Sequence, residues 1–247
     1  ANLFNHFDNS SFVMDFEVLQ INNRLWYGVT DRLQIGINLP IYIIEGGTMD
    51  NYIEKFHSTF GITNERNENP RNKFIFGTKE LQSDVMLGDI TGHIRYRFFD
   101  NPGLSCGVKI QTPSLTSTEW FDHSQVGVGF DATIFYSIGE FFITNSSNII
   151  NAGDTEVLGL EINNVQFSNV TSVDWRIIQG WSIVIQLAAT SGQVELLSYN
   201  HWTYEVTGGC RIHLGSNHWF DFGVIENIMT YDNTVDVGFY VGLTFKN

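Results

Sequence analysis

Residues 33–43 read Leu-Gln-Ile-Gly-Ile-Asn-Leu-Pro-Ile-Tyr-Ile, so an apolar residue stands at every second position. The same period of two runs through residues 204–214 and again through residues 235–245. Successive side chains of a β-strand point to opposite faces, so each run presents one apolar face and one mixed, more polar face. Each run has the length that a tilted strand needs to cross the hydrocarbon core of a membrane. The three runs therefore predict membrane-spanning strands.

Further strands follow from the same alternation along the rest of the chain. They are expected at residues 12–29, 86–99, 104–111, 125–136, 140–150, 166–178, 181–190 and 218–226. The apolar face of the first of these switches near Leu19, which indicates a bulge or an extension beyond the membrane. The total is about eleven strands, and short turns alternate along the chain with longer loops at about 45–83, 112–124, 151–165, 191–202 and 227–234. The pattern predicts one all-β domain over residues 1–247, a transmembrane antiparallel up-and-down β-barrel.

Aromatic residues gather next to the expected short turns and predict an interfacial girdle. They are Trp26, Tyr27, Phe98, Phe99, Tyr136, Phe141, Trp175, Trp181, Trp219 and Phe220. Short turns are periplasmic in outer-membrane barrels, and single-chain bacterial barrels have an even number of strands. The count of about eleven therefore predicts about twelve strands in the full barrel, with a first strand upstream of Ala1 and both termini of the full-length chain in the periplasm.

Composition excludes several other classes of protein. The formal net charge of −14 argues against nucleic-acid binding, which needs a basic surface. No apolar run approaches the length of a transmembrane helix. The two cysteines, Cys106 and Cys210, fall on apolar positions of expected strands, which favours free thiols over a disulfide. We expect no metal site, because no Cys/His cluster has zinc-ligand spacing, and we expect no cofactor.

Two stretches in the first third of the chain resemble a known family. Residues 28–42 read Gly-Val-Thr-Asp-Arg-Leu-Gln-Ile-Gly-Ile-Asn-Leu-Pro-Ile-Tyr, and residues 46–61 read Gly-Gly-Thr-Met-Asp-Asn-Tyr-Ile-Glu-Lys-Phe-His-Ser-Thr-Phe-Gly, followed by Asn-Pro-Arg-Asn at 69–72. Both are similar to the uncharacterised Gram-negative family catalogued as domain of unknown function 3187. The resemblance implies an outer-membrane location and supplies no activity and no catalytic residues. Members of that family usually carry a further segment before the Ala-Asn-Leu-Phe of residues 1–4, in agreement with the expected first strand.

Charged residues are expected on the inner face of the barrel, because Arg or Lys facing lipid at mid-membrane costs about 2–4 kcal/mol. The candidates for lining the lumen are Asp89, His93, Arg95, Arg97, Lys109, Asp131, Asp174, Arg176, Glu205, Arg211, His213, Asp221 and Asp236. Two interpretations stay open. In one, Arg95, Arg97 and Lys109 face acidic strands across a hydrated pore and select a polar or anionic solute. In the other, salt bridges cross-link the lumen and stiffen the wall.

The loop at 45–83 is predicted to hold a short helix on the extracellular side. Thr48 can cap its N-terminus and Gly61 can end it. Met49, Tyr52, Ile53, Phe56 and Phe60 share one face at helical spacing. This face is expected either to plug or constrict the lumen or to pack as a lid on neighbouring loops.

Catalytic motifs are weak, and we expect no enzyme. Residues 103–107 match the pattern of a nucleophile elbow, but they open a strand instead of joining a strand to a helix. His57 and Glu54 share a helix face without a second pair of ligands.

The function expected from these features is a narrow outer-membrane channel for a small hydrophilic solute, constricted by the 45–83 loop. The alternative is a non-conducting structural barrel that docks a lipoprotein or a surface-appendage complex, and a lipid-modifying enzyme comes third. The expected partners are outer-membrane lipids (lipopolysaccharide and phospholipid), a small polar solute and, under the alternative, that lipoprotein or surface complex; nucleic acid is not among them.

Overall fold

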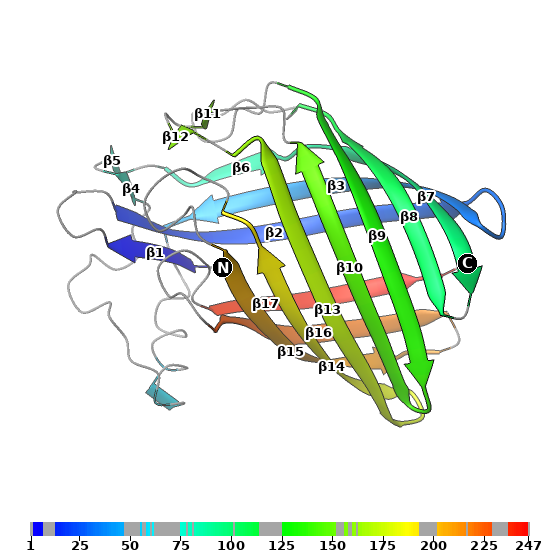
Figure 1. The fold of residues 1–247 in the computed structure, drawn as a ribbon. Helices are drawn as coiled ribbons and strands as arrows, with labels where there is room; N and C mark the ends of the chain where they lie inside the picture. Colours follow the sequence, from blue (N-terminus) through cyan, green and yellow to red (C-terminus); the bar gives the residue numbers. More distant parts are fainter. Residues whose placement is uncertain are drawn as a thin grey trace.

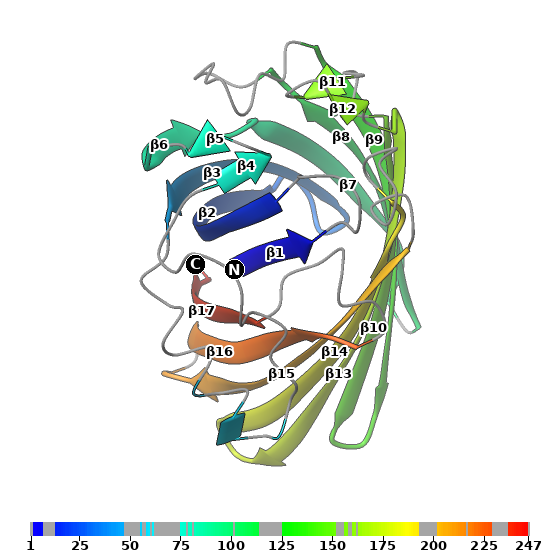
Figure 2. The ribbon, with the colours of Figure 1, turned by 90° about the vertical axis from the view of Figure 1, so that its left-hand side faces the viewer.

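The fold is an antiparallel sheet that curls into an open barrel (Figures 1 and 2). The computed structural model describes residues 2–6, 13–46, 55, 58–59, 61, 75–77, 79–80, 82–100, 102–113, 125–151, 156–157, 160–161, 163–192, 202–215, 217–228 and 237–246. No helix in these ranges is long and apolar enough to span a membrane.

Long strands build the wall, and each pairs with its neighbours in chain order. They are β2 (Val13–Gly28), β3 (Leu33–Glu45), β7 (Thr91–Asp100), β8 (Gly103–Gln111), β9 (Gly127–Ile138), β10 (Phe141–Asn151), β13 (Val165–Ile178), β14 (Trp181–Thr190), β15 (Thr203–His213), β16 (His218–Asn227) and β17 (Val237–Phe245). The short strands are β1 (Asn2–His6), β4 (Ile75–Gly77), β5 (Lys79–Glu80), β6 (Asp84–Leu87), β11 (Glu156–Val157) and β12 (Leu160–Glu161). The predicted all-β, antiparallel up-and-down architecture is confirmed.

One predicted strand is interrupted. Residues 86–99 were expected to be continuous, but β6 ends at Leu87 and β7 begins at Thr91, and both pair with β3. At the break, the Gly88 amide donates to the Pro40 carbonyl at 2.9 Å, and the Tyr42 ring occupies the place that a Cβ on Gly88 would take. A side chain at position 88 would therefore collide with the ring, so the backbone can take this path only with glycine at position 88.

The sheet is not closed. β1 pairs with residues 13–17 of β2, so the chain itself supplies five residues next to β2, where sequence analysis expected only an upstream strand. The eleven long strands and β1 make the expected twelve, and the short strands β4, β5 and β6 bring the described sheet to fifteen. Among the described residues, the edge of β2 beyond Glu17 and the free edge of β17 have no strand partner. Figure 2 shows this opening between β2 and β17.

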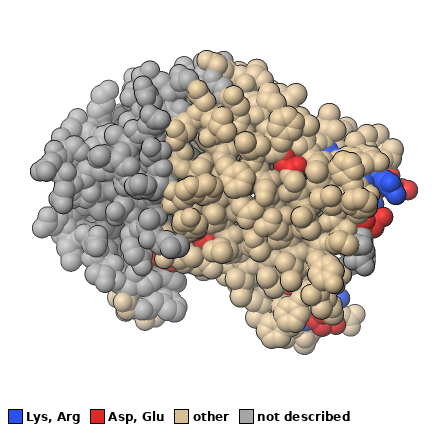
Figure 3. Space-filling model, viewed as in Figure 1, with Lys and Arg blue, Asp and Glu red and all other residues tan. Residues whose placement is uncertain are grey.

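The two faces of the sheet differ as the alternation predicted. Large apolar side chains stand exposed on the outer face; Ile94, Phe130, Ile134 and Ile185 are more than half exposed. Over β9, β10 and β13 that face consists mainly of uncharged residues, and charged side chains gather toward the end with the short turns (Figure 3). Few apolar side chains are fully buried; the described ones are Ile44, Met86 and Val184. The molecule thus turns its apolar residues outward, as a barrel in lipid does.

The helix expected near residues 48–61 is described only in part. Lys55, Ser58 and Thr59 are helical, and the hydroxyls of Ser58 and Thr59 donate to the Lys55 carbonyl at 2.9 and 2.7 Å. Gly61 has a φ of 69°, which suits the end of a helix. The plug face of Met49, Tyr52, Ile53, Phe56 and Phe60 lies outside the described residues. Farther along this loop, β4 pairs with the start of β2 and extends the wall at the long-loop end.

Candidate channel lining

An ion pair on the inner face joins Arg95 of β7 to Asp131 of β9. Arg95 Nη2 donates to Asp131 Oδ2 at 2.9 Å. The two residues flank Gly107 of β8 in register, and a Cβ on Gly107 would lie 2.6 Å from Asp131 Oδ1. Glycine in the intervening strand therefore lets the charges meet across it. The Asp131 side chain is 12% exposed and the Arg95 side chain 32%, so this pair is partly shielded from bulk solvent.

The neighbouring row of residues alternates large side chains with glycines. In register across five strands it reads Trp26, Gly36, His93, Lys109 and Gly129. The Trp26 ring lies over Gly36, and the Lys109 side chain lies over Gly129. Each glycine thus makes room for the large side chain on the neighbouring strand, and these two side chains lie along the sheet.

Trp26 lies on the inner face, so its assignment to the lipid-facing girdle was wrong. Its ring centroid is 5.2 Å from that of His93, and Arg95 Cζ lies 5.1 Å from its centre. Arg24, two residues earlier on β2, shares the inner face with Trp26. Arg24 was not among the predicted lumen residues, because the alternation of this strand is irregular near Leu19. The alternation of Asn22, Arg24 and Trp26 with Ile21, Leu25 and Tyr27 was the available signal.

These side chains form one basic wall, defined here as Arg24, His93, Arg95 and Lys109. They come from β2, β7 and β8, and Asp131 is the carboxylate paired with them. Nδ1 of His93 and Nε of Arg95 are buried without a hydrogen-bond partner among the described residues. Buried polar atoms without a partner carry a desolvation cost.

A second cluster lies on β13, β15 and β16. Arg211 donates through Nη1 to Asp174 at 2.7 Å and through Nε to Asp221 at 2.6 Å. Two carboxylates around one guanidinium leave the cluster with a net negative charge. Glu205 lies farther along β15 on the same face and is partly buried. Asp174, Glu205 and Asp221, with Arg211, are called the acidic wall.

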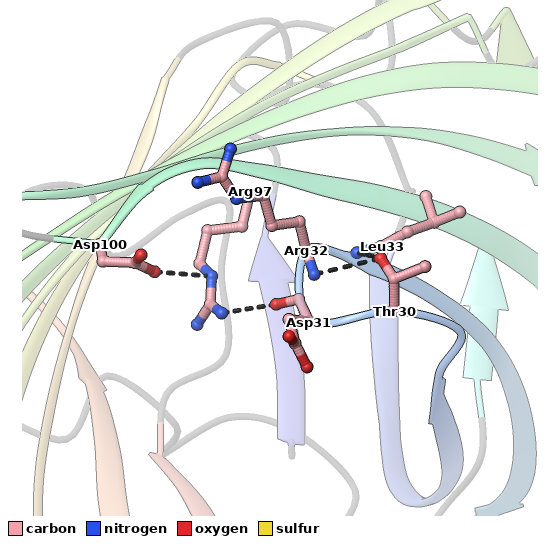
Figure 4. A network of polar contacts seen from close by, with 6 residues as sticks. All are labelled: Thr30, Asp31, Arg32, Leu33, Arg97 and Asp100. Carbon is pink, nitrogen blue, oxygen red and sulfur yellow. Dashed lines mark hydrogen bonds and ion pairs between the residues drawn. The ribbon is translucent and has the colours of Figure 1, made fainter.

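Three candidates lie at the end with the short turns, away from both walls. Arg97 forms an ion pair with Asp100 at 3.0 Å and donates to the Asp31 carbonyl in the β2–β3 turn (Figure 4). Arg176 is 4.0 Å from Glu140, and its guanidinium lies over the Phe142 ring. The exposed His213 ring is 5.9 Å from that of Trp219. These residues connect turns and strand ends at the rim.

Asp89 and Asp236 complete the predicted set. Asp89 is buried at the break between β6 and β7, where it accepts a hydrogen bond from Gln111 Nε2. Asp236 lies outside the described residues. Among the described residues, no three His, Cys, Asp or Glu side chains are grouped to hold a metal ion, and both cysteines are free thiols.

The basic and acidic walls lie on opposite sides of the barrel. Figure 2 shows β2, β3 and β7 facing β15 and β16 across the interior. The inner-face ion pairs named above join strands that are at most two apart, so each lies along the wall. None of the described ion pairs connects the two walls across the lumen.

Comparisons with known proteins agree with this architecture. The family described as Protein of unknown function (DUF3187) matches residues 1–247, the whole chain. Among solved structures, an outer membrane channel from Pseudomonas putida F1 is similar in fold, with a TM-score of 0.60 at 14% sequence identity. The match covers 98% of this chain and 87% of that channel. No curated protein matches the chain.

Proposed function

The chain belongs to the family described as Protein of unknown function (DUF3187), and from that premise we propose that it is a narrow channel for small hydrophilic solutes in the outer membrane of a Gram-negative bacterium. The fold likeness to an outer membrane channel supports this proposal, as does the division into an uncharged outer face and a charged inner face. The 45–83 loop, which begins and ends at the long-loop end of the barrel, is proposed to narrow the entrance.

The observation that carries the proposal is that the described inner-face ion pairs run along each wall and not across the lumen. The Arg95–Asp131 and Arg211–Asp174–Asp221 contacts hold charged groups against their own wall and leave the space between the walls free of described ion pairs. Opposed charged walls create a transverse field that orients polar solutes and interacts strongly with ions. A lumen cross-linked for rigidity would instead pair its charges across the interior.

Conductance in planar bilayers tests the proposal. Purified protein is expected to give small, discrete current steps, and deleting residues 46–75 is expected to enlarge them. The double variant R95Q/K109Q removes two charges from the basic wall and is expected to shift the reversal potential in a salt gradient toward cation selectivity. R97Q is the matched control, because Arg97 belongs to the rim, and its reversal potential should stay near that of the unaltered protein.

Absence of current from correctly folded protein, with and without residues 46–75, would contradict a channel. The non-conducting scaffold would then be favoured, and a lipoprotein or surface-complex partner retained through purification would support it.

A further inference from the structure

The outer face of β10 and β13 carries a polar cluster in the middle of its apolar surface. It consists of Asn145 and Ser147 on β10 and Asn169 and Thr171 on β13, and is called the amide patch. Asn145 Nδ2 donates to Asn169 Oδ1 at 3.1 Å and to Thr171 Oγ1 at 2.8 Å. Asn169 Nδ2 donates to Asn145 Oδ1 at 3.2 Å and to Ser147 Oγ at 2.8 Å.

The strand register places the amide patch on the lipid-facing side. Asn145 lies beside Ile134 of β9, and Thr171 lies beside Leu187 of β14. These two apolar neighbours are 51% and 47% exposed, as outward-pointing residues are. The charged residues of the same strands, Asp131 and Asp174, occupy positions of the opposite parity and point inward.

The position of the patch makes it costly in lipid. Asn145 and Ser147 lie near the middle of β10 (Phe141–Asn151), away from the aromatic stack of Phe141 on Trp175 that marks the short-turn end. Hydrocarbon offers no hydrogen-bond partner, so polar groups exposed to it lose the interactions that water would provide. Nothing in the wall itself requires amides here, since aliphatic residues surround them.

The side chains in the row through the patch are small enough for the backbone of another membrane-embedded element to approach. One register row across four strands reads Ala132, Ser147, Asn169 and Ala189. Larger exposed side chains rise on either side, among them Phe130 at 58% and Ile134 at 51%. Small residues permit close contact between membrane-embedded elements, and polar side chains among them can hydrogen-bond across the contact.

The remaining hydrogen-bonding capacity of the patch is self-complementary. The described contacts leave the hydroxyl protons of Ser147 and Thr171 without an acceptor. They also leave one lone pair on each amide oxygen, Asn145 Oδ1 and Asn169 Oδ1. Two donors and two acceptors remain on an uncharged surface, so the patch matches a copy of itself and lacks the charge that would select an acidic or basic partner.

We propose that the amide patch is the contact surface of a homodimer within the membrane. With a two-fold axis along the membrane normal through the patch, the patch of one copy faces the same patch of the other, and the tilted strands of the two copies cross there. The remaining hydroxyl protons of one copy then face the remaining amide oxygens of the other. This inference rests on the placement in a membrane and does not depend on conduction.

Energy transfer between donor-labelled and acceptor-labelled copies in phospholipid vesicles tests the dimer over a range of lipid-to-protein ratios. The unaltered protein should show transfer that saturates as the lipid is reduced. The variant N145L/N169L should need at least tenfold less lipid per protein to reach half of that transfer. Replacing lipid-facing amides with leucine does not threaten folding, and heat-modifiable electrophoretic mobility checks that the barrel has formed. C210L is the matched control, because Cys210 occupies an outward position on β15 in a different register row.

The results of this experiment distinguish a homodimer from a monomer and from a complex with another membrane protein. Loss of transfer in N145L/N169L and its retention in C210L support the homodimer. Equal transfer in all three proteins, or a monomer at every ratio for the unaltered protein, overturns it. A different membrane protein that co-purifies stoichiometrically and is lost only in N145L/N169L also overturns it, since the patch would then serve another partner. Conductance measured on the same samples tests the channel separately.

Discussion

Glycine at position 107 shows how one missing side chain shapes the lumen wall. Arg95 and Asp131 meet across β8 only because no Cβ stands between them. The Gly107→Ala variant would place a methyl group 2.6 Å from Asp131 Oδ1 and 3.1 Å from the Ile94 carbonyl. We expect it to lower the free energy of unfolding by about 1–3 kcal/mol, in the range of overpacked sites. Urea unfolding in lipid vesicles measures the change.

Gly242→Ala is the matched control for that variant. A Cβ on Gly242 would meet the Asp221 side chain at ordinary contact distances of 3.7 and 3.9 Å. Its stability should stay within about 0.5 kcal/mol of the unaltered protein, as for most substitutions away from tight sites. Equal losses in both variants would show that the Arg95–Asp131 geometry has no special sensitivity.

Trp26 provides a residue-scale test of whether the inner face is wet. In a variant that retains Trp26 as its sole tryptophan, iodide or acrylamide should quench its fluorescence, and lipids brominated on their acyl chains should not. A variant retaining only Trp175, which is exposed and stacked on Phe141, should show the reverse pattern. Quenching of Trp26 by brominated lipid would contradict its position beside His93 and Arg95.

Alternation predicted single residues well wherever one strand sufficed. His93, Arg95, Lys109 and Asp131 were assigned inward from their own strands, and the structure places them there. Trp26 was assigned to the aromatic girdle because it lies near a turn. Nearness to a turn indicates depth in the membrane but does not indicate which face of the sheet a residue occupies. Asn145 and Asn169 went unnoticed because their contact depends on the register of two strands separated by a long loop, and sequence alone does not give that register.

At the scale of elements, the polar contacts of Arg97, called the clasp, join two neighbouring turns at the rim. Arg97 on β7 binds the Asp31 carbonyl in the β2–β3 turn and pairs with Asp100 at its own strand end (Figure 4). Within that turn, Thr30 Oγ1 accepts the amide protons of Arg32 and Leu33 at 3.2 and 3.0 Å. Side chain and backbone together hold the turn against β7.

Removing the clasp should loosen the turn and leave the strands in place. We expect Arg97→Ala to speed amide hydrogen exchange at residues 29–33 by about three- to tenfold, since local opening there costs about 0.6–1.4 kcal/mol less. Exchange of the central β9 amides, which have strand partners on both sides, should not change. A uniform increase throughout the barrel would show that Arg97 supports the whole fold.

Strand bounds were predictable because hydrophobic alternation stops where the chain leaves the wall. The observed β14 (Trp181–Thr190) coincides with the prediction, and β8 differs by one residue at its start. The break between β6 and β7 was missed because Leu87, Gly88, Asp89 and Ile90 still read as part of a strand. At the break the pairing with β3 shifts by one residue opposite Pro40, which has no amide proton to donate, and the Tyr42 ring packs over Gly88.

At the scale of the whole molecule, the opposed walls predict an ion selectivity that depends on salt. The Debye length falls from about 10 Å at 0.1 M to about 3 Å at 1 M, so fields reaching across a lumen are screened. The difference in reversal potential between R95Q/K109Q and the unaltered protein should therefore be largest near 0.1 M KCl and shrink by more than half near 1 M. A difference independent of salt would point to blockage or altered shape as its cause.

Fold class could be predicted from the sequence, because each long strand carries its own period-two signal. The opening that remains between the two edges, β2 and β17, could not be predicted in the same way. It arises from curvature summed over all strand pairs, to which each residue adds little. The division into a basic wall and an acidic wall could not be predicted either, since it depends on which strands face each other across the interior.

The short reach of the inner-face ion pairs has a consequence for how such a barrel can diversify. Arg211 with its two aspartates occupies β13–β16, and Arg95 with Asp131 occupies β7–β9, so each guanidinium finds its carboxylate partners within its own cluster. Each cluster lies within a few consecutive strands. Duplication, exchange or point substitution within one group of hairpins can therefore alter the chemistry of half the lumen while the other half keeps its own, and new specificities can arise without a compensating change on the far side.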